Sequence, residues 1–439
     1  MARPSPRGLW NTSRTKNLFK AFLEVALESN RPIALQPFGQ APCRAVCVVA
    51  PLAHSTGYGR ALRLAAHPGK AFVQLQKGFE QVLKSAARVS SPFHDPAAAH
   101  PIHGAGPCGP SALQHDHDPS QCDHDHGPKH IYIYSPSSAV RDKPAFRRGI
   151  ARLQALGHQV EVDPDALAVH TRFAGDDATR LAAIHRAAAS GADMALISRG
   201  GYGLSRLLGG IRYKAVAKAV EKGTRFVGVS DFTAFQLALL AQTGATSWAG
   251  PSLGADFGVA GGEPDDIMEA CFDDLLSGHG EGSGWRMHRE KPHATTGKPA
   301  VPDVYVKSAT LWGGNLSVLA SLVGTPYLPE VKGGVLFLED VHEHPYRIER
   351  MLTQLLHAGV LARQKAVVLG QFTNFKLAPH DKGYKLQSVV DWLRSQIKAP
   401  VLTNLPFGHV PTKVLLPVGA TVSLSVEDRD ALIYWGHTH

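Results

Sequence analysis

The chain has 439 residues, of which 44% are hydrophobic and 19% charged, a balance typical of a globular protein with more than one domain. No apolar run approaches the about 18 residues of a membrane-spanning helix. This excludes a helical membrane protein and predicts a soluble one without a membrane partner. The five cysteines, four of them before residue 130, do not resemble a disulfide framework, and we expect a reducing compartment.

The net charge of +9 is unevenly distributed along the chain. Residues 1–93 contain thirteen Lys and Arg against three Asp and Glu, whereas the remaining chain contains thirty-three against thirty-four. The basic surplus therefore belongs to the N-terminal segment. Because the main body lacks the positive surplus that nucleic-acid binding requires, we expect no nucleic-acid partner.

Residues 1–130 differ in composition from the rest and are predicted to form a disordered or weakly folded extension. A targeting peptide is a weaker alternative, suggested by the basic and hydroxyl residues near the start. Residues 94–130 hold eight histidines, some alternating with aspartate, and such a tract can bind zinc, nickel or copper adventitiously. Catalytic metal sites instead take ligands from separated, rigid positions. We therefore interpret the tract as a linker and predict no metal cofactor.

Strands and helices alternate from residue 131 onward. The expected strands cover 131–134, 159–162, 192–198 and 225–229, and the expected helices cover 144–156, 176–189 and 235–242. Because strands alternate with helices, we predict a parallel sheet with crossover helices. The prediction is an α/β domain of the Rossmann or flavodoxin type over 131–257.

Two loops of this domain carry glycine or a reactive residue type. Residues 199–203 read Arg-Gly-Gly-Tyr-Gly, a loop that can bring backbone N–H groups close to an anion or a carbonyl. Ser230 follows an expected strand at a sharp turn before a helix, which is the layout of a nucleophile elbow. Taken alone, the pattern favours a simpler interpretation, Ser230 as the N-cap of that helix. Both loops should lie at carboxyl ends of strands, where open α/β sheets place their sites.

Residues 258–300 are rich in glycine, histidine and proline around one expected helix, and are predicted to form an interdomain linker. A smaller, β-rich α+β domain is expected over 301–439 and ends in a hairpin. Within it, Glu339 follows an apolar strand and His409 lies in a loop. A reactive serine needs a base and a group that orients the base. Either residue also reads as an ordinary surface side chain, and spacing does not show that they meet Ser230.

In this order, the segments resemble the LD-carboxypeptidases, serine peptidases also called muramoyltetrapeptide carboxypeptidases. The resemblance runs from about residue 131 to 436 and rests on Ser-Pro-Ser-Ser at 135–138, Arg-Gly-Gly-Tyr-Gly at 199–203, Gly-Val-Ser-Asp-Phe-Thr at 228–233, Gly-Gly-Asn-Leu at 313–316, Leu-Glu-Asp-Val at 338–341 and Gly-His at 408–409. The chain departs from the family at Ala249-Gly250-Pro251, where the family often has His-Gly-Pro.

The resemblance implies a Ser-Glu-His triad in which Ser230 is the nucleophile, His409 the general base and acid, and Glu339 the group that orients the histidine. It implies a cytoplasmic enzyme of murein recycling that releases terminal D-alanine from L,D-tetrapeptides, without metal or cofactor. For the oxyanion of acyl transfer we expect the backbone N–H groups of Asp231 and Gly201. For the free carboxylate of the substrate we expect Arg199.

Three alternatives stay open, and so does a homodimer. A peptidase of the same fold, resembling the microcin-immunity type, would cleave peptidyl-nucleotide antibiotics and would need an aromatic side chain such as Trp248 or Trp285 to stack on the base. A sheet-based binding protein without catalysis would keep Ser230 only as a helix cap. A histidine-rich metal-handling protein would bind metal through residues 94–130.

Overall fold

The computed structural model describes residues 48–49, 62–63, 127–289, 301 and 303–436. The predicted extension and the histidine-rich tract fall almost wholly outside these residues, apart from a short antiparallel pair, β1 (Val48–Val49) and β2 (Leu62–Arg63). In the described part of the chain, no helix is long and apolar enough to cross a membrane. The same residues contain no group of three or more His, Cys, Asp or Glu placed to hold a metal ion.

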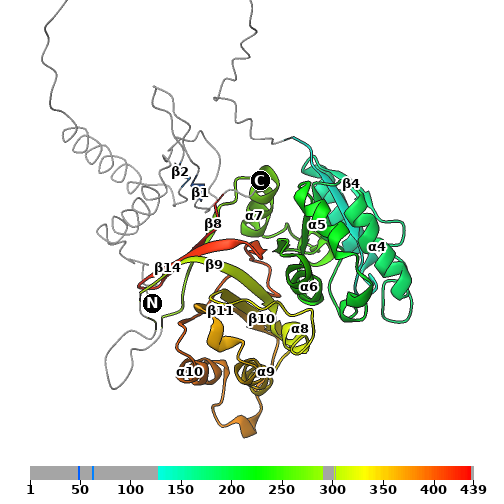
Figure 1. The fold of residues 1–439 in the computed structure, drawn as a ribbon. Helices are drawn as coiled ribbons and strands as arrows, with labels where there is room; N and C mark the ends of the chain where they lie inside the picture. The colour runs from blue at the N-terminus through cyan, green and yellow to red at the C-terminus, as the bar shows by residue number, and fades with distance from the viewer. Residues whose placement is uncertain (1–47, 50–61, 64–126, 290–300, 302, 437–439) are drawn as a thin grey trace, which may run out of the picture.

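The first domain is built on a sheet with helices on both faces (Figure 1). Its strands are β3 (His130–Tyr134), β4 (Gln159–Val162), β5 (Met194–Ile197), β6 (Arg225–Gly228), β7 (Ser247–Ala249) and β13 (Leu416–Val418). Its helices are α3 (Lys143–Ala155), α4 (Asp177–Ala189), α5 (Tyr213–Glu221), α6 (Thr233–Thr243) and α7 (Asp266–Ser277). The strand order β4-β3-β5-β6-β7, all parallel, is the flavodoxin-like order and confirms the predicted fold class.

Side-chain alternation along β3 explains the layers of this domain. Ile131 and Ile133 point to one face and belong to the core cluster that includes side chains of α3 and α7. Tyr132 and Tyr134 point to the other face, into the core shared with α4, α5 and α6. Because both faces are covered, the parallel strands read as nearly continuous apolar runs in the sequence. Three of the helices begin where an aspartate accepts hydrogen bonds from the first turn: Asp142, Asp176 and Asp265.

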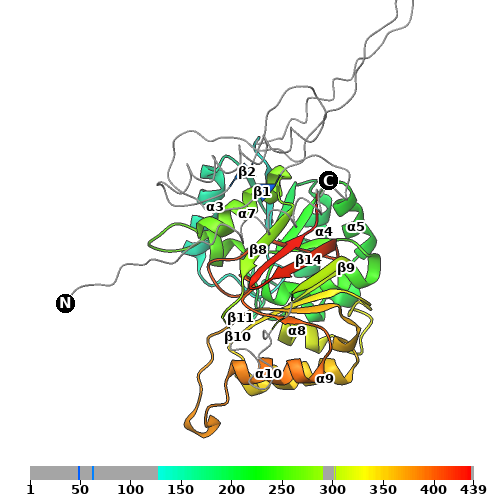
Figure 2. The same ribbon diagram turned by 90° about the vertical axis from the view of Figure 1, so that its left-hand side faces the viewer.

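The second domain is a mixed seven-stranded sheet. Its strands are β8 (Gly282–Arg286), β9 (Val304–Asn315), β10 (Val335–Val341), β11 (Ala366–Thr373), β12 (Val401–Leu402), β14 (Thr421–Glu427) and β15 (Asp430–Tyr434). Its helices are α8 (Leu316–Ser321), α9 (Pro345–His357) and α10 (Leu386–Gln396). The order is β12-β11-β10-β9-β14-β15-β8, parallel from β12 to β9 and antiparallel beyond. Figure 2 shows α9 and α10 beneath the sheet.

One apolar core continues from the first domain into the second. Phe235 and Leu239 of α6 belong to the same buried cluster as Leu319 of α8 and Phe337 of β10. In Figure 1, α6 lies beside α8, at the boundary between the two domains. Because fully burying one large apolar side chain stabilises a fold by about 1.5–3 kcal/mol, a shared core of this kind holds the two sheets in a fixed relation.

Two segments differ from the sequence-based expectation. The predicted linker over 258–300 contains α7 and also β8, which forms the edge of the second sheet beside β15. The glycine-rich sequence of β8 does not predict a strand, because the strand forms by pairing with residues that are distant in the sequence. Strand β13 of the second half of the chain pairs with β7 and completes the first sheet. The two domains are therefore not consecutive pieces of sequence.

Candidate active site

Ser230 lies in the turn between β6 and α6. Its φ angle is 67°, in the left-handed region that side chains other than glycine rarely adopt. The residue opens a short 3₁₀ turn, Ser230–Phe232, that leads into α6, and neither this turn nor α6 has a side-chain capping hydrogen bond. The structure therefore gives no support to Ser230 as a helix cap. A strained turn that lifts a hydroxyl from a strand end is the geometry of a nucleophile elbow.

The predicted glycine loop follows β5 and lies directly against Ser230. A Cβ atom at Gly200 would come within 2.8 Å of Ser230 Cβ, so only glycine fits there. Gly201 has a φ of 89°, and a Cβ on it would approach Ser138 Oγ to 2.5 Å. Both loops thus meet at the carboxyl ends of neighbouring strands, as predicted. Within the described residues, the backbone N–H of Gly201 donates no hydrogen bond to the protein.

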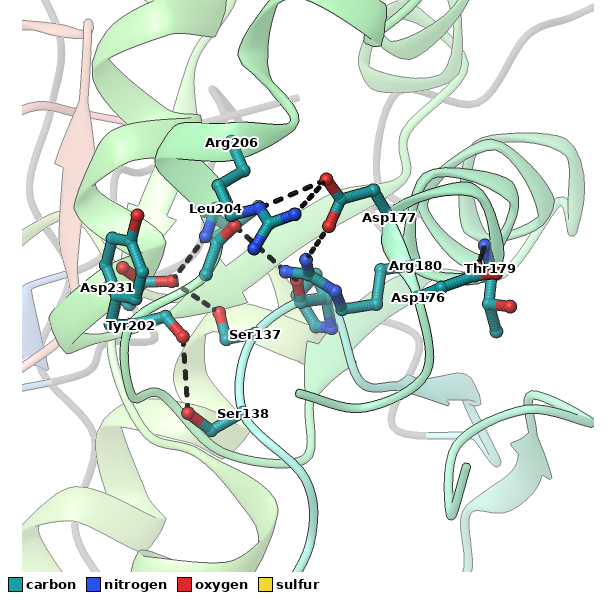
Figure 3. A network of polar contacts seen from close by, with 12 residues as sticks. Ser137, Ser138, Asp176, Asp177, Thr179, Arg180, Tyr202, Leu204, Arg206 and Asp231 are labelled. Atoms are coloured by element: carbon teal, nitrogen blue, oxygen red, sulfur yellow. Dashed lines mark hydrogen bonds and ion pairs between the residues drawn. The ribbon is translucent and has the colours of Figure 1, made fainter. Parts of the chain in front are cut away.

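Asp231, the residue after Ser230, holds this loop in place (Figure 3). Its buried carboxylate accepts hydrogen bonds from Ser137 Oγ and from the backbone N–H of Leu204, both at 2.8 Å. Burial raises the pKa of Asp231, although these two donors oppose the shift. The carboxylate therefore ties the loop after β3 and the loop after β5 to the turn that carries Ser230.

Arg180 joins the same two loops through hydrogen bonds to their carbonyl groups. Its fully buried guanidinium donates to the carbonyl oxygens of Gly203 at 2.9 Å and Pro136 at 3.3 Å. It also pairs with Asp177 at 2.6 Å, and Asp177 in turn binds Arg206, as Figure 3 shows. A buried charge is costly unless it is paired and hydrogen-bonded, and here both terminal nitrogens of the guanidinium have partners, whereas Nε has none among the described residues. The network makes the glycine loop a rigid surface beside Ser230.

Glu339 and His409 form a hydrogen-bonded pair in the second domain. Glu339 lies in β10 and is 0% exposed, and its Oε2 is 2.8 Å from Nδ1 of His409, in the loop after β12. Burial lowers the pKa of His409, but the hydrogen bond and negative charge of Glu339 outweigh burial, so the net shift is upward. The structure thus brings together two residues that lie far apart in the sequence.

Asn315 secures the carboxylate of Glu339 from the other side. Its Nδ2 donates to Glu339 Oε1 at 3.1 Å and to Asp340 at 2.9 Å. Burial and the charge of Glu339 raise the pKa of Asp340 to about 6. The backbone N–H of Asn315 donates to Thr233 Oγ1 at 3.0 Å, at the start of α6. A short chain of contacts therefore connects the Glu339–His409 pair with the Ser230 turn.

A cavity of about 580 Å³ opens where the two domains meet, and Ser230 lines it. The first domain contributes Tyr202 and Ser205 among others, and the second contributes Asn315 and Asp340. Among the described residues no hydrogen bond joins Ser230 to His409, whose side chain is 25% exposed. The structure thus places the serine at the cavity and the Glu339–His409 pair beside the same boundary, without a direct contact between them.

Other residues predicted for the site do not line this cavity. Arg199 is half-buried, donates to the carbonyl of Ala139 at 3.2 Å, and is not among the cavity-lining residues. Burial first, and then the positive charges of Arg141 and Arg172, lower the pKa of Arg199. Trp248 and Trp285 are both buried, and neither lines the cavity.

Sequence reasoning missed Asn315, Asp340 and Tyr202 as parts of the site. Tyr202 is 50% exposed and is the glycine-loop side chain that lines the cavity. Asn315 stands directly after two glycines, and Asp340 directly after Glu339. The available sequence signals were a pair of glycines and a pair of acidic residues at the ends of apolar strands. Neither signal indicates which residue Asn315 or Asp340 contacts.

Comparisons with known proteins agree with this architecture. The family model described as the LD-carboxypeptidase N-terminal domain matches residues 131–250, and the model described as the LD-carboxypeptidase C-terminal domain matches residues 308–424. A protein of Bacillus subtilis (strain 168) named probable murein peptide carboxypeptidase is 29% identical over 286 residues, which cover 65% of this chain and 85% of the relative.

Two solved structures are similar over about 70% of this chain. The muramoyltetrapeptide carboxypeptidase from Oxalobacter formigenes is 39% identical with a TM-score of 0.62, over 70% of this chain and 98% of that one. MccF in complex with glutamyl sulfamoyl guanosine is 21% identical with a TM-score of 0.61, over 71% and 99% of the two chains, and shares the fold alone. Since both family models match in order and a relative 39% identical is covered almost completely, this chain belongs to the LD-carboxypeptidase family of peptidases.

Proposed function

We propose that this chain is a serine LD-carboxypeptidase that releases terminal D-alanine from murein tetrapeptides in cytoplasmic cell-wall recycling, without metal or cofactor. The observation that carries the proposal is the Glu339–His409 pair, with its 2.8 Å hydrogen bond, at the boundary where the Ser230 turn opens into a cavity. The names of the Bacillus and Oxalobacter relatives support the same substrate class.

The histidine acts first as a base in the proposed reaction. Glu339 engages Nδ1 of His409, which leaves Nε2 as the nitrogen that accepts the proton of Ser230 Oγ. The upward shift of the His409 pKa makes it a stronger base, and the buried carboxylate stabilises the imidazolium that forms. The serine oxygen attacks the scissile carbonyl, His409 protonates the departing D-alanine, and water then resolves the acyl-enzyme.

The glycine loop supplies the oxyanion site in this proposal. The oxygen of the tetrahedral intermediate would accept hydrogen bonds from the backbone N–H groups of Gly201 and Asp231. Each such donor stabilises the transition state by about 3 kcal/mol. Asp231 lies in the first turn of its 3₁₀ segment, where N–H groups have no intrahelical partner. Arg199 would bind the terminal carboxylate, because no carboxylate of the described residues pairs with its guanidinium.

The alternative with a specific observation behind it is cleavage of a peptidyl-nucleotide. The fold is shared with MccF, and the half-exposed ring of Tyr202 lines the cavity, where it could stack on a base. Against this alternative, Trp248 and Trp285 are packed inside the protein. A binding protein that has lost catalysis would retain the cavity but would show no turnover of any amide.

Mass spectrometry of the purified full chain with three substrates tests the proposal. We expect loss of one D-alanine from a murein L,D-tetrapeptide and no cleavage of a peptidyl-sulfamoyl nucleoside or an all-L peptide. Cleavage of the nucleoside conjugate alone would favour the microcin-immunity type. No cleavage of any of the three, together with saturable binding of the tetrapeptide, would favour the binding protein.

A further inference from the structure

The loop that carries His409 crosses from the second domain to the first. Its base is closed by a hydrogen bond of 2.8 Å from the backbone N–H of Val414 to the carbonyl of Pro406. On one side of the loop, His409 binds Glu339 of the second sheet. On the other side, Thr412 donates to Asp265 at the start of α7, and Lys413 pairs with Asp256. The loop is therefore fastened to both domains within a few residues.

The Lys413–Asp256 pair is buried almost completely, with side-chain exposures of 4% and 3%. One carboxylate oxygen of Asp256 accepts a hydrogen bond from Lys413 Nζ. The other accepts one from the backbone N–H of Ser252 at 2.7 Å. Because both charges are removed from water, the pair stabilises the fold only while the two groups stay in contact. Removing one partner leaves an uncompensated buried charge. The position of Lys413 is therefore specified by Asp256.

Asp256 lies in a turn of the first domain that hydrogen bonds hold at both ends. It lies in a π-helical turn, Leu253–Phe257, a rare conformation that is frequent at functional sites. The backbone N–H of Gly254 donates to the carbonyl of Ser198 at 2.9 Å, the residue before the glycine loop. Arg152 of α3 donates to the carbonyls of Phe257 and Val259 at 2.8 and 2.9 Å, which fixes the far end of the turn. This turn thus connects Asp256 to the end of β5, the strand beside the one that leads to Ser230.

We propose that the buried Lys413–Asp256 ion pair is a positioning device that fixes the His409 loop against the nucleophile domain and sets the separation of His409 from Ser230. The inference rests on the proposed function for its kinetic consequences. Glu339 orients the imidazole from within the second domain. The shared apolar core and the Asn315–Thr233 hydrogen bond hold the two domains together, and the buried ion pair ties the His409 loop itself to the first domain. An error of about 1 Å in such a separation can reduce turnover by about 100-fold.

The pair also has an electrostatic consequence at His409. The charged groups that act on the imidazole are Glu339 and Asp340, which raise its pKa, and Lys413, which lowers it. Loss of the Lys413 charge should therefore raise the pKa of His409, whereas loss of the Asp256 charge should not. A purely structural role for the pair would predict the same behaviour for both single variants.

The test compares Lys413→Met, Asp256→Asn and the paired variant in the full chain. We expect kcat on the L,D-tetrapeptide to fall about 10- to 100-fold in each, with KM changed less than about threefold. The acid limb of the pH profile of kcat/KM should move to higher pH in Lys413→Met and in the paired variant, but not in Asp256→Asn. Arg286→Met, which removes an exposed ion pair with Asp430, is the matched control and should leave both readouts unchanged.

Two further measurements keep the inference separate from the proposed function. NMR titration of His409 reports its pKa without substrate, and the rate of Ser230 labelling by a fluorophosphonate reports its activation without a peptide. If the wild type does not cleave the tetrapeptide, these readouts still decide the inference. If a single variant does not fold, the paired variant, which leaves no uncompensated charge, decides it. Wild-type labelling rates and an unmoved His409 pKa in the paired variant would overturn the inference.

Discussion

The two sheets contribute to the site in different ways. The first is parallel up to β7, and it presents the glycine loop and Ser230 at neighbouring strand ends. The second is mixed, and it presents Glu339 from within a strand and His409 from a loop closed by long-range contacts. The proposed nucleophile is therefore positioned by local geometry, whereas the proposed base and the carboxylate that orients it are positioned by tertiary structure.

This difference indicates how the two halves should respond to change. At Ser230, strain in one turn and the close approach of one glycine determine the position of the hydroxyl. At His409, two domains and a fully buried carboxylate determine the position and charge of the imidazole. Substitutions in the first region should act on geometry, and those in the second should also act on pH dependence.

The largest expected effect is the loss of the nucleophile or the base. Ser230→Ala and His409→Ala should each reduce hydrolysis of L,D-tetrapeptide by at least about 10⁴-fold, while thermal unfolding stays within a few degrees of the wild type. Release of D-alanine, followed by mass spectrometry, checks this expectation. Ser395→Ala, on the exposed side of α10, is the control. Full activity of either variant would contradict the triad assignment.

The second effect concerns the carboxylate and should separate geometry from charge. Glu339→Gln keeps the shape but removes the charge, so activity should fall about 10³-fold. Because Glu339 raises the pKa of His409, the acid limb of kcat/KM, at which the base becomes protonated, should lie above about pH 6.5 in the wild type and move to lower pH in the variant. Glu349→Gln on α9 is the control and should change neither the activity nor the acid limb of kcat/KM. An acid limb that stays in place in Glu339→Gln would show that the carboxylate does not act on the titrating base.

A smaller effect should follow from crowding the nucleophile turn. Gly200→Ala places a methyl group 2.8 Å from Ser230 Cβ, so we expect turnover to fall about 10- to 100-fold and the free energy of unfolding to fall by about 1–3 kcal/mol. Gly262→Ala, where nothing lies within 4 Å, is the matched control, and its stability should change by less than about 0.5 kcal/mol. Equal effects of the two substitutions on turnover would argue against contact between the glycine loop and the nucleophile.

Chelation should have the smallest effect of all. The proposed chemistry uses side chains and backbone N–H groups, so treatment with a chelator should leave activity within about twofold of the untreated enzyme. Activity that is lost on chelation and restored by zinc would favour the histidine-rich tract over 94–130 as part of the function. A variant lacking those residues would then be the informative comparison.

The first half of the site was largely predictable from sequence, and the second half was not. Apolar runs, a glycine-rich loop and a serine after a strand are local signals, and β5, β6 and α6 lie close to their predicted bounds. The pairing of Glu339 with His409 depends on contacts between residues 70 positions apart, and the resemblance to a family, not the spacing, suggested it. Asn315 and β13 gave no periodic signal, because their partners are distant in sequence.

The pairing of β13 with β7 also has a consequence for biosynthesis. Leu416 lies opposite Ala249, so β7 leaves the ribosome long before the strand that covers it. At usual rates of synthesis this interval is on the order of ten seconds, during which an edge of the nascent sheet stays open to other chains. A similar interval separates the appearance of Ser230 from that of His409. A nascent chain therefore presents Ser230 before its proposed base exists, and the segment that carries His409 directly precedes the strand that completes the first sheet.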